Sequence, residues 1–179
     1  AAAHATTTVA KAPTTAVATT AVASTTAKAS TAAFPATGEL AVSFTYAPSS
    51  GPARNPYIAV WVEDASGQLV KTVSLWFEQG KGSRWLGDLR SWAAKSGNRP
   101  DATTSGATRS AGSYSVAWNG TDLNGAKVAA GTYTIFVESA REHGPHNLTS
   151  ATVTVGSGPV TVALPDQGEL SALTAKLVV

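Results

Sequence analysis

The chain has 179 residues, a formal net charge of +2 at neutral pH and no cysteine. The lack of cysteine excludes disulfides, thiolate metal ligands and cysteine nucleophiles. The 13 basic residues are scattered along the chain, so no nucleic-acid partner is expected. No apolar run approaches the length of about 18 residues that a transmembrane helix needs, so no membrane span is predicted.

Composition divides the chain into a tail and one domain. Residues 1–35 are almost entirely alanine, threonine, serine, valine, lysine and proline. They carry too little apolar bulk to form a core, so we predict a disordered tether. A plain tether and an O-glycosylated stalk both fit this composition. The start at Ala1 is typical of a chain cut by a signal peptidase, so we expect an exported protein of the periplasm or cell surface.

Residues 36–179 are predicted to form one domain of about eight short strands. Period-two alternation and β-branched residues mark most of them, whereas residues 57–63 are apolar on both faces, which suggests a central position in a sheet. The pattern predicts an all-β, immunoglobulin-like antiparallel β-sandwich with one short inserted helix. The expected strands are 39–46, 57–63, 69–77, 113–118, 132–137, 148–155, 160–164 and 170–179.

The two central strands are predicted to form a long hairpin, with aromatic residues turned toward the core. Between them lie Asn119-Gly120 and Asn124-Gly125, dipeptides that accept positive φ and close turns. Asp122 and Asn124 also suggest a calcium loop, but no bidentate glutamate follows at the required position. A turn is therefore the expected structure of this connection.

A helix is expected over residues 86–94, because Trp85, Leu86, Leu89 and Trp92 recur at spacings of three and four. We expect it to cover one end of the sandwich. Residues 95–112 follow as a loop without apolar period. Loops longer than about 12–15 residues in a compact domain are usually functional or disordered.

The segment 111–137 resembles the immunoglobulin-like domain of the flagellar hook-capping protein. A larger part of the chain, 39–179, resembles a family of predicted periplasmic proteins of unknown function built on that domain. The resemblance implies the fold and the compartment, and brings no established activity. The positions that match the hook-capping pattern are Ala111, Gly112, Tyr114, Trp118, Gly120, Asp122, Gly125, Gly131 and Tyr133.

The run Ser105-Gly106-Ala107-Thr108, preceded by Asp101, resembles the acceptor motif for covalent FMN attachment in exported redox proteins. The resemblance implies that a flavin transferase would join FMN to Thr108 through a phosphoester. Asp101 lies one residue farther from Ser105 than the motif places it. The implied function is an accessory module of an extracytoplasmic redox system, with the transferase and envelope redox proteins as partners.

A flavin in this loop needs a flat stacking partner and a cation near its phosphate. Trp85 and Trp92 are the first candidates for stacking, with Trp76 as a third. The cationic candidates are Arg90, Arg109 and Arg141. The alternative is that the run occurs by chance in a chain rich in these residue types. The protein would then be a cofactor-free structural or protein-binding module of the cell envelope.

A second candidate cluster is Glu142, His143 and His146, a set of ligands suitable for zinc, copper or haem iron. Gly144-Pro145 makes this segment a turn, so the alternative is that Arg141 and Glu142 pair with neighbouring residues. No G-x-S-x-G motif or triad spacing occurs. Hydrolytic activity is therefore not expected, and an enzyme is the less favoured reading of the chain.

Overall fold

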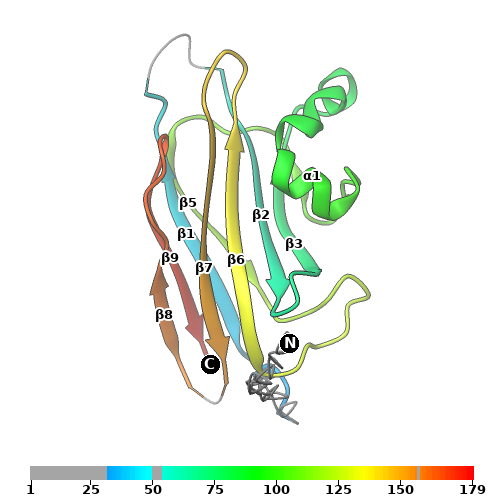
Figure 1. Cartoon of the computed structure of the whole chain (residues 1–179), viewed down its shortest axis with the longest axis vertical. Coiled ribbons are helices and arrows are strands. Elements are labelled where there is room, and N and C mark those ends of the chain that lie inside the picture. Colours follow the sequence, from blue (N-terminus) through cyan, green and yellow to red (C-terminus); the bar gives the residue numbers. More distant parts are fainter. Residues whose placement is uncertain (1–31, 50–53, 157) are drawn as a thin grey trace, which may run out of the picture.

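The computed structural model describes residues 32–49, 54–156 and 158–179, which form a two-layered β-sandwich with helices on one side (Figure 1). Of the predicted tether, 1–35, residues 1–31 lie outside the described residues. The elements are β1 Glu39–Tyr46, β2 Tyr57–Asp64, β3 Leu69–Trp76, η1 Gly80–Asp88, α1 Arg90–Ser96, β4 Ser105–Gly106, β5 Gly112–Trp118, β6 Gly131–Ala140, β7 His146–Val155, β8 Val160–Ala163 and β9 Leu170–Val178.

The strands form two sheets, one with the order β5-β1-β9-β8 and the other with the order β4-β3-β2-β6-β7. All pairings are antiparallel except that of β3 with the two-residue strand β4. This confirms the predicted immunoglobulin-like sandwich. The strand that the sequence did not predict is β4, which is too short to show a period of two.

The predicted central hairpin is wrong. Strand β5 pairs with β1 in the four-stranded sheet, whereas β6 pairs with β2 and β7 in the other sheet. The connection between β5 and β6 therefore crosses from one layer to the other. Alternation of apolar residues determines which face of a strand is buried, but not which strand lies beside it.

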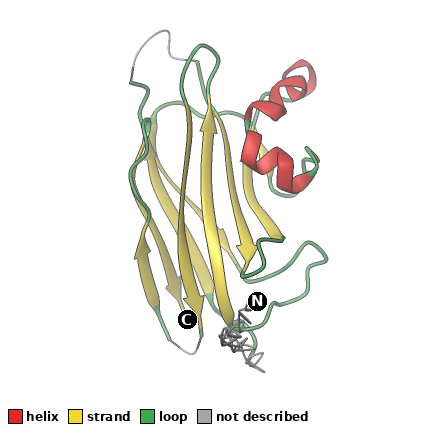
Figure 2. Cartoon of the chain, in the orientation of Figure 1, coloured by secondary structure: helices red, strands yellow, loops and turns green. Residues whose placement is uncertain are grey.

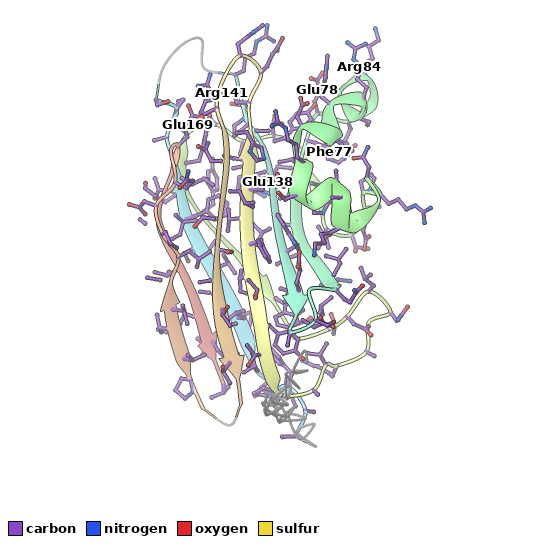
Figure 3. All side chains as sticks on the ribbon, in the orientation of Figure 1. Phe77, Glu78, Arg84, Glu138, Arg141 and Glu169 are labelled. Atoms are coloured by element: carbon purple, nitrogen blue, oxygen red, sulfur yellow. The ribbon has the colours of Figure 1, made fainter. Side chains whose placement is uncertain are left out.

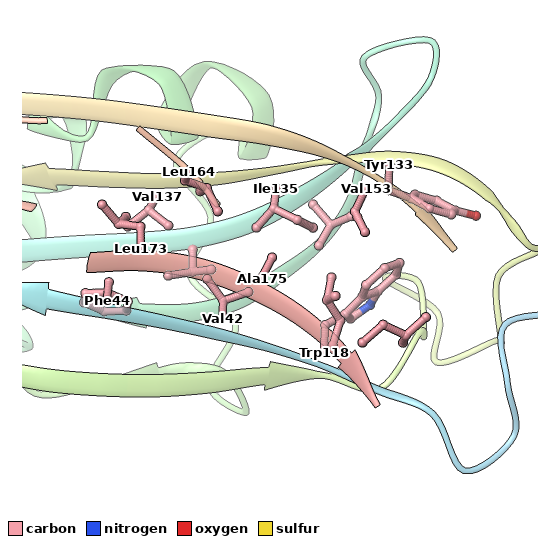
Figure 4. Close-up of a cluster of buried hydrophobic side chains, with 14 of the residues drawn as sticks. Val42, Phe44, Trp118, Tyr133, Ile135, Val137, Val153, Leu164, Leu173 and Ala175 are labelled. Atoms are coloured by element: carbon pink, nitrogen blue, oxygen red, sulfur yellow. The ribbon is translucent and has the colours of Figure 1, made fainter. Parts of the chain in front are cut away.

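The main core fills the space between the two sheets (Figure 4). The inward face of β1 is fully buried, and its rings and branched chains meet those of β6. Phe34, at the end of the predicted tether, belongs to this core. It is 2 % exposed, its ring packs edge-on against Trp118, and its backbone N–H donates to the carbonyl of Val128 at 2.8 Å. The folded unit thus extends at least to Phe34.

The single predicted helix is in fact two consecutive segments, η1 and α1, and they do not cover the end of the sandwich. They lie against the outer face of the five-stranded sheet, beside β2 and β3 (Figure 2). That face is apolar, and Trp61 stacks on Phe136 with ring centroids 4.9 Å apart. The helices cover this second cluster, which explains why β2 is apolar on both faces.

Candidate functional site at the helical end of the sandwich

A pocket of about 430 Å³ opens at the end of the sandwich where β2 begins and β6 ends. It lies between the η1 segment, the loop that precedes β2 and the β6–β7 turn. This volume falls in the range of about 300–1,000 Å³ that is typical of small-molecule sites. The residues of its lining that matter below are Arg54, Tyr57, Glu78, Trp85, Thr108 and Glu142.

A buried ion pair supports one side of this end. The guanidinium of Arg141 donates to both oxygens of Glu169, at 2.6 and 3.1 Å, and both side chains are 1 % exposed. Ser49 also donates to Glu169 through its backbone N–H and its hydroxyl, at 2.9 and 3.0 Å. Glu169 thus joins the chain before β2, the β6–β7 turn and the start of β9 (Figure 3).

The same contacts determine the ionisation of the pair. Burial opposes the charged form of Glu169, but the hydrogen bonds from Arg141 and Ser49 outweigh it, and the pKa of Glu169 is lowered. The carboxylate raises the pKa of Arg141 further above its ordinary value. Arg141 lines the pocket, yet its charge is already neutralised by Glu169. It is therefore a poor partner for a ligand phosphate.

A second buried carboxylate holds the helices in place. Glu138, on the outer face of β6, is fully buried and accepts hydrogen bonds from the backbone N–H groups of Ser91 and Trp92, at 2.9 and 2.8 Å. A negative charge at the start of a helix satisfies N–H groups that have no partner within the helix. His146 contacts the same carboxylate at 2.5 Å. Glu138 therefore anchors the start of α1, which directly follows the pocket wall formed by η1, to β6.

The residues of the FMN-like motif lie along the edge of the five-stranded sheet. Asp101 closes a turn by accepting from the backbone N–H and the hydroxyl of Thr103, which lowers its pKa. Ser105 and Gly106 form β4 beside β3. The Ser105 hydroxyl is buried and has no hydrogen-bond partner among the described residues. Ala107 is exposed, and the half-buried Thr108 lines the pocket.

Of the tryptophans proposed as stacking partners, only Trp85 is accessible. Its side chain is 42 % exposed, lines the pocket and lies 4.0 Å below the guanidinium of Arg84. Trp92, a residue of α1, is fully buried between this helix and the sheet, and its indole N–H donates to the hydroxyl of Thr72 at 3.0 Å. Trp76 is 1 % exposed. The assignment of Trp92 to stacking is therefore corrected, because the apolar spacing that predicted the helix also directs Trp92 into the core.

The histidine cluster is not brought together. His146 contacts Glu138, whereas the highly exposed His143 approaches Glu142 at 3.6 Å. Within the described part of the chain, no group of three or more suitable side chains could hold a metal ion. Arg141 and Glu142 instead pair with Glu169 and Arg54, as the alternative interpretation predicted.

The connection with Asp122 is a turn, as expected. The Asp122 carboxylate accepts from the backbone N–H groups of Asn124 and Ala126, at 2.8 and 2.9 Å. Both bonds go to the same oxygen, Oδ1, which therefore serves the turn rather than a calcium ion. This turn lies at the end of the sandwich opposite the pocket.

Sequence reasoning missed four of the residues that line the pocket, namely Arg54, Tyr57, Glu78 and Asp88. Tyr57 donates to the carbonyl of Gly82 at 2.9 Å, and burial raises its pKa. These four come from three separate segments. The one available signal was the polar residues just outside two strands, Arg54-Asn55 before β2 and Glu78-Gln79 after β3.

Fold and site together define a β-sandwich domain with a ligand-sized pocket at one end. The chain belongs to a family of predicted periplasmic proteins (DUF2271), whose model matches residues 39–172. This confirms, at the level of the family, the expectation of an exported, periplasmic protein. No match was found among curated proteins or among solved structures. In the described residues, neither helical segment has the length and apolar character that a membrane crossing requires.

Proposed function

We propose that the protein is a periplasmic flavin-carrying module, with FMN attached to the hydroxyl of Thr108. The observation that carries this proposal is the position of Thr108. It ends the Ser105–Thr108 run that resembles an FMN acceptor, and it lines a ligand-sized pocket beside the exposed Trp85.

The segment also meets the physical demands of a modification site. A transferase must bring its own backbone close to the acceptor, so small residues and an accessible edge are needed. Ala107 is exposed, and the space around Gly106 is open to 4 Å from the position of a Cβ atom. Strand β4 is at the edge of its sheet, with β3 on one side only. The exposed edge beside Thr108 therefore supports access by another protein to this segment.

The attachment reaction balances with FAD as donor. The Thr108 oxygen forms a bond to the phosphorus of the FMN half, the pyrophosphate bond of FAD breaks, AMP leaves and the hydroxyl proton is released. No electrons are exchanged in this step. The bound flavin would supply hydride or electron transfer, while the protein supplies position and electrostatics. Arg109 directly follows Thr108 in the chain, so it is the first candidate to offset the charge of the phosphate. Its guanidinium lies 4.4 Å from the centre of the Trp76 ring.

A cofactor-free binding module is the second candidate. The pocket itself favours it, because a cavity of this size with polar and aromatic lining suits a small ligand without covalent attachment. The likeness of residues 111–137 to the immunoglobulin-like domain of the hook-capping protein also supports this second candidate. Such sandwiches often serve as structural or protein-binding units.

The experiment is intact-mass analysis of the full chain, co-expressed in the periplasm with an FMN transferase. We expect an added mass equal to FMN less water in the wild type and in Thr108→Ser, which keeps a hydroxyl. Thr108→Ala should be unmodified. Ser110→Ala is the matched control, because Ser110 is exposed and lies two residues beyond Thr108, outside the motif, so the modification should persist.

An unmodified wild type, beside another acceptor that the same transferase does modify, would exclude the flavin carrier and leave the binding module. Modification that survives Thr108→Ala would move the attachment to another hydroxyl. Peptide mapping of the modified protein would then identify that residue.

A further inference from the structure

We infer that the pocket at the helical end is the seat of a flavin ring, with Trp85 as its stacking wall. This inference rests on the proposed function, since the ring would belong to the flavin on Thr108. It goes further by assigning the ring a fixed, partly desolvated place in this chain. The alternative is a flavin that hangs from an exposed loop into solvent.

The first argument is connectivity. Thr108 and Trp85 come from different segments, a loop after β4 and the helical segment η1, yet both line the same pocket of about 430 Å³. The ribityl chain separates the flavin phosphate from its ring, so the ring reaches beyond the attachment point. The pocket lies directly beside Thr108, and its volume is in the range of sites for small aromatic ligands.

The second argument is the state of Trp85. In the described residues the other four tryptophans are at most 2 % exposed, whereas Trp85 is 42 % exposed. An indole ring that stays in water does not gain the free energy that burial of its apolar surface would supply. Its neighbour Arg84 lies over the ring at 4.0 Å, which restricts its movement. An aromatic ring held in this way at a pocket wall is prepared for stacking against another flat ring.

The third argument is the charge of the lining. Glu78, Asp88 and Glu142 contribute three carboxylates, while the charge of Arg141 is neutralised by Glu169. Arg54 is the remaining arginine of the lining, and it contacts Glu142 at 3.5 Å. An anionic group would be repelled here, whereas the uncharged isoalloxazine ring would not be. The charge distribution therefore favours the uncharged ring over the phosphate inside the pocket, and the phosphate on Thr108 would lie toward Arg109, which is not a lining residue.

The test measures the fluorescence of the flavin, which falls strongly when the ring stacks on tryptophan. Two samples are needed: the full chain modified by the transferase, and the unmodified full chain titrated with free FMN and with lumiflavin, which has no phosphate. We expect at least fivefold quenching in the modified wild type relative to free FMN. We also expect lumiflavin to bind more tightly than FMN.

Three variants sharpen the test. Trp85→Ala should restore the fluorescence to nearly that of free FMN without loss of the added mass. Trp85→Tyr keeps a flat, electron-rich ring and should retain most of the quenching. Leu123→Ala removes an apolar side chain that is 57 % exposed at the opposite end of the sandwich, and should change nothing.

The outcomes separate this inference from the proposed function. If FMN is attached but fluoresces like free FMN, and Trp85→Ala does not change this, the ring does not lie in the pocket. The carrier function would remain intact. Absence of attachment together with Trp85-dependent binding of lumiflavin would retain the seat and overturn Thr108 as the anchor. Absence of both attachment and binding would overturn both proposals.

Discussion

The two ends of the sandwich satisfy their polar groups in different ways. At the end with the Asp122 turn, the side-chain bonds of the turn are local: Trp118 donates to the carbonyl of Thr121, and Tyr133 donates to that of Ala129. The long-range bond from Phe34 to Val128 at this end joins backbone groups. At the pocket end the partners are far apart in sequence, as with Ser49 and Glu169. Local bonds stabilise a turn by themselves, whereas distant ones form only when the whole domain has assembled. The pocket end therefore depends on long-range electrostatics, and the other end on turn geometry.

The largest effect is expected from Glu169→Gln, which leaves the Arg141 guanidinium buried without its counter-charge. Loss of one partner of a buried pair costs about 3–5 kcal/mol. This loss is measured as the difference in the free energy of unfolding by denaturant between the wild type and the variant. Glu142→Gln is the matched control, because the Glu142–Arg54 pair is exposed and should contribute less than about 1 kcal/mol. Equal losses in the two variants would show that burial does not matter at this end.

The same pair gives a pH dependence. The folded pKa of Glu169 lies below its ordinary value of 4.5. Its contribution to stability is therefore complete above the unfolded pKa, and is lost as the pH falls from about 4.5 through the lowered folded pKa. Unfolding of the wild type and of Glu169→Gln, measured across this range, should show a weaker acid dependence in the variant. Parallel curves would contradict this prediction.

The next effect concerns the opposite end, where Gly120 has a φ of +73° and a Cβ atom would lie 2.2 Å from the Phe34 ring. Gly120→Ala combines backbone strain of about 1–2 kcal/mol with overpacking of about 1–3 kcal/mol. Gly125→Ala is the control, since its φ is +82° but nothing lies within 4 Å. The difference between their unfolding free energies measures the steric part, and no difference would mean that Phe34 moves aside.

A smaller loss is expected for Asp122→Ala, which removes an acceptor of two backbone hydrogen bonds in an exposed turn. We expect a loss of about 0.5–1.5 kcal/mol. Asn124→Ala, in the same turn, should have almost no effect. If the loss for Asp122→Ala approached that for Glu169→Gln, the proposed contrast between local and long-range stabilisation would be wrong.

The smallest effect on stability is expected for Trp85→Ala. An exposed side chain outside the two cores usually contributes within about 0.5 kcal/mol. Trp92→Ala removes a fully buried indole from the neighbouring helix and should cost about 3–5 kcal/mol. Thermal unfolding of the two variants compares them directly. Strong destabilisation by Trp85→Ala would make this residue part of the fold rather than a ligand wall.

Local patterns in the sequence determined most of the strands, the turn at Asp122 and the fold class. The alternation in β1 predicted its buried face, because that face depends only on the period of the strand. The Asn-Gly dipeptides marked tight turns for the same local reason. The segment that ends at Thr108 was also recognisable, as a run of small residues.

Only the tertiary structure decided which strands are neighbours and which side chains meet. It separated β5 from β6, buried Trp92, left Trp85 exposed and paired Arg141 with Glu169. Each of these depends on contacts between residues far apart in the chain, and a residue's type and spacing do not specify its distant partner. The pocket beside Thr108 has the same origin, since its walls come from segments that only folding brings together.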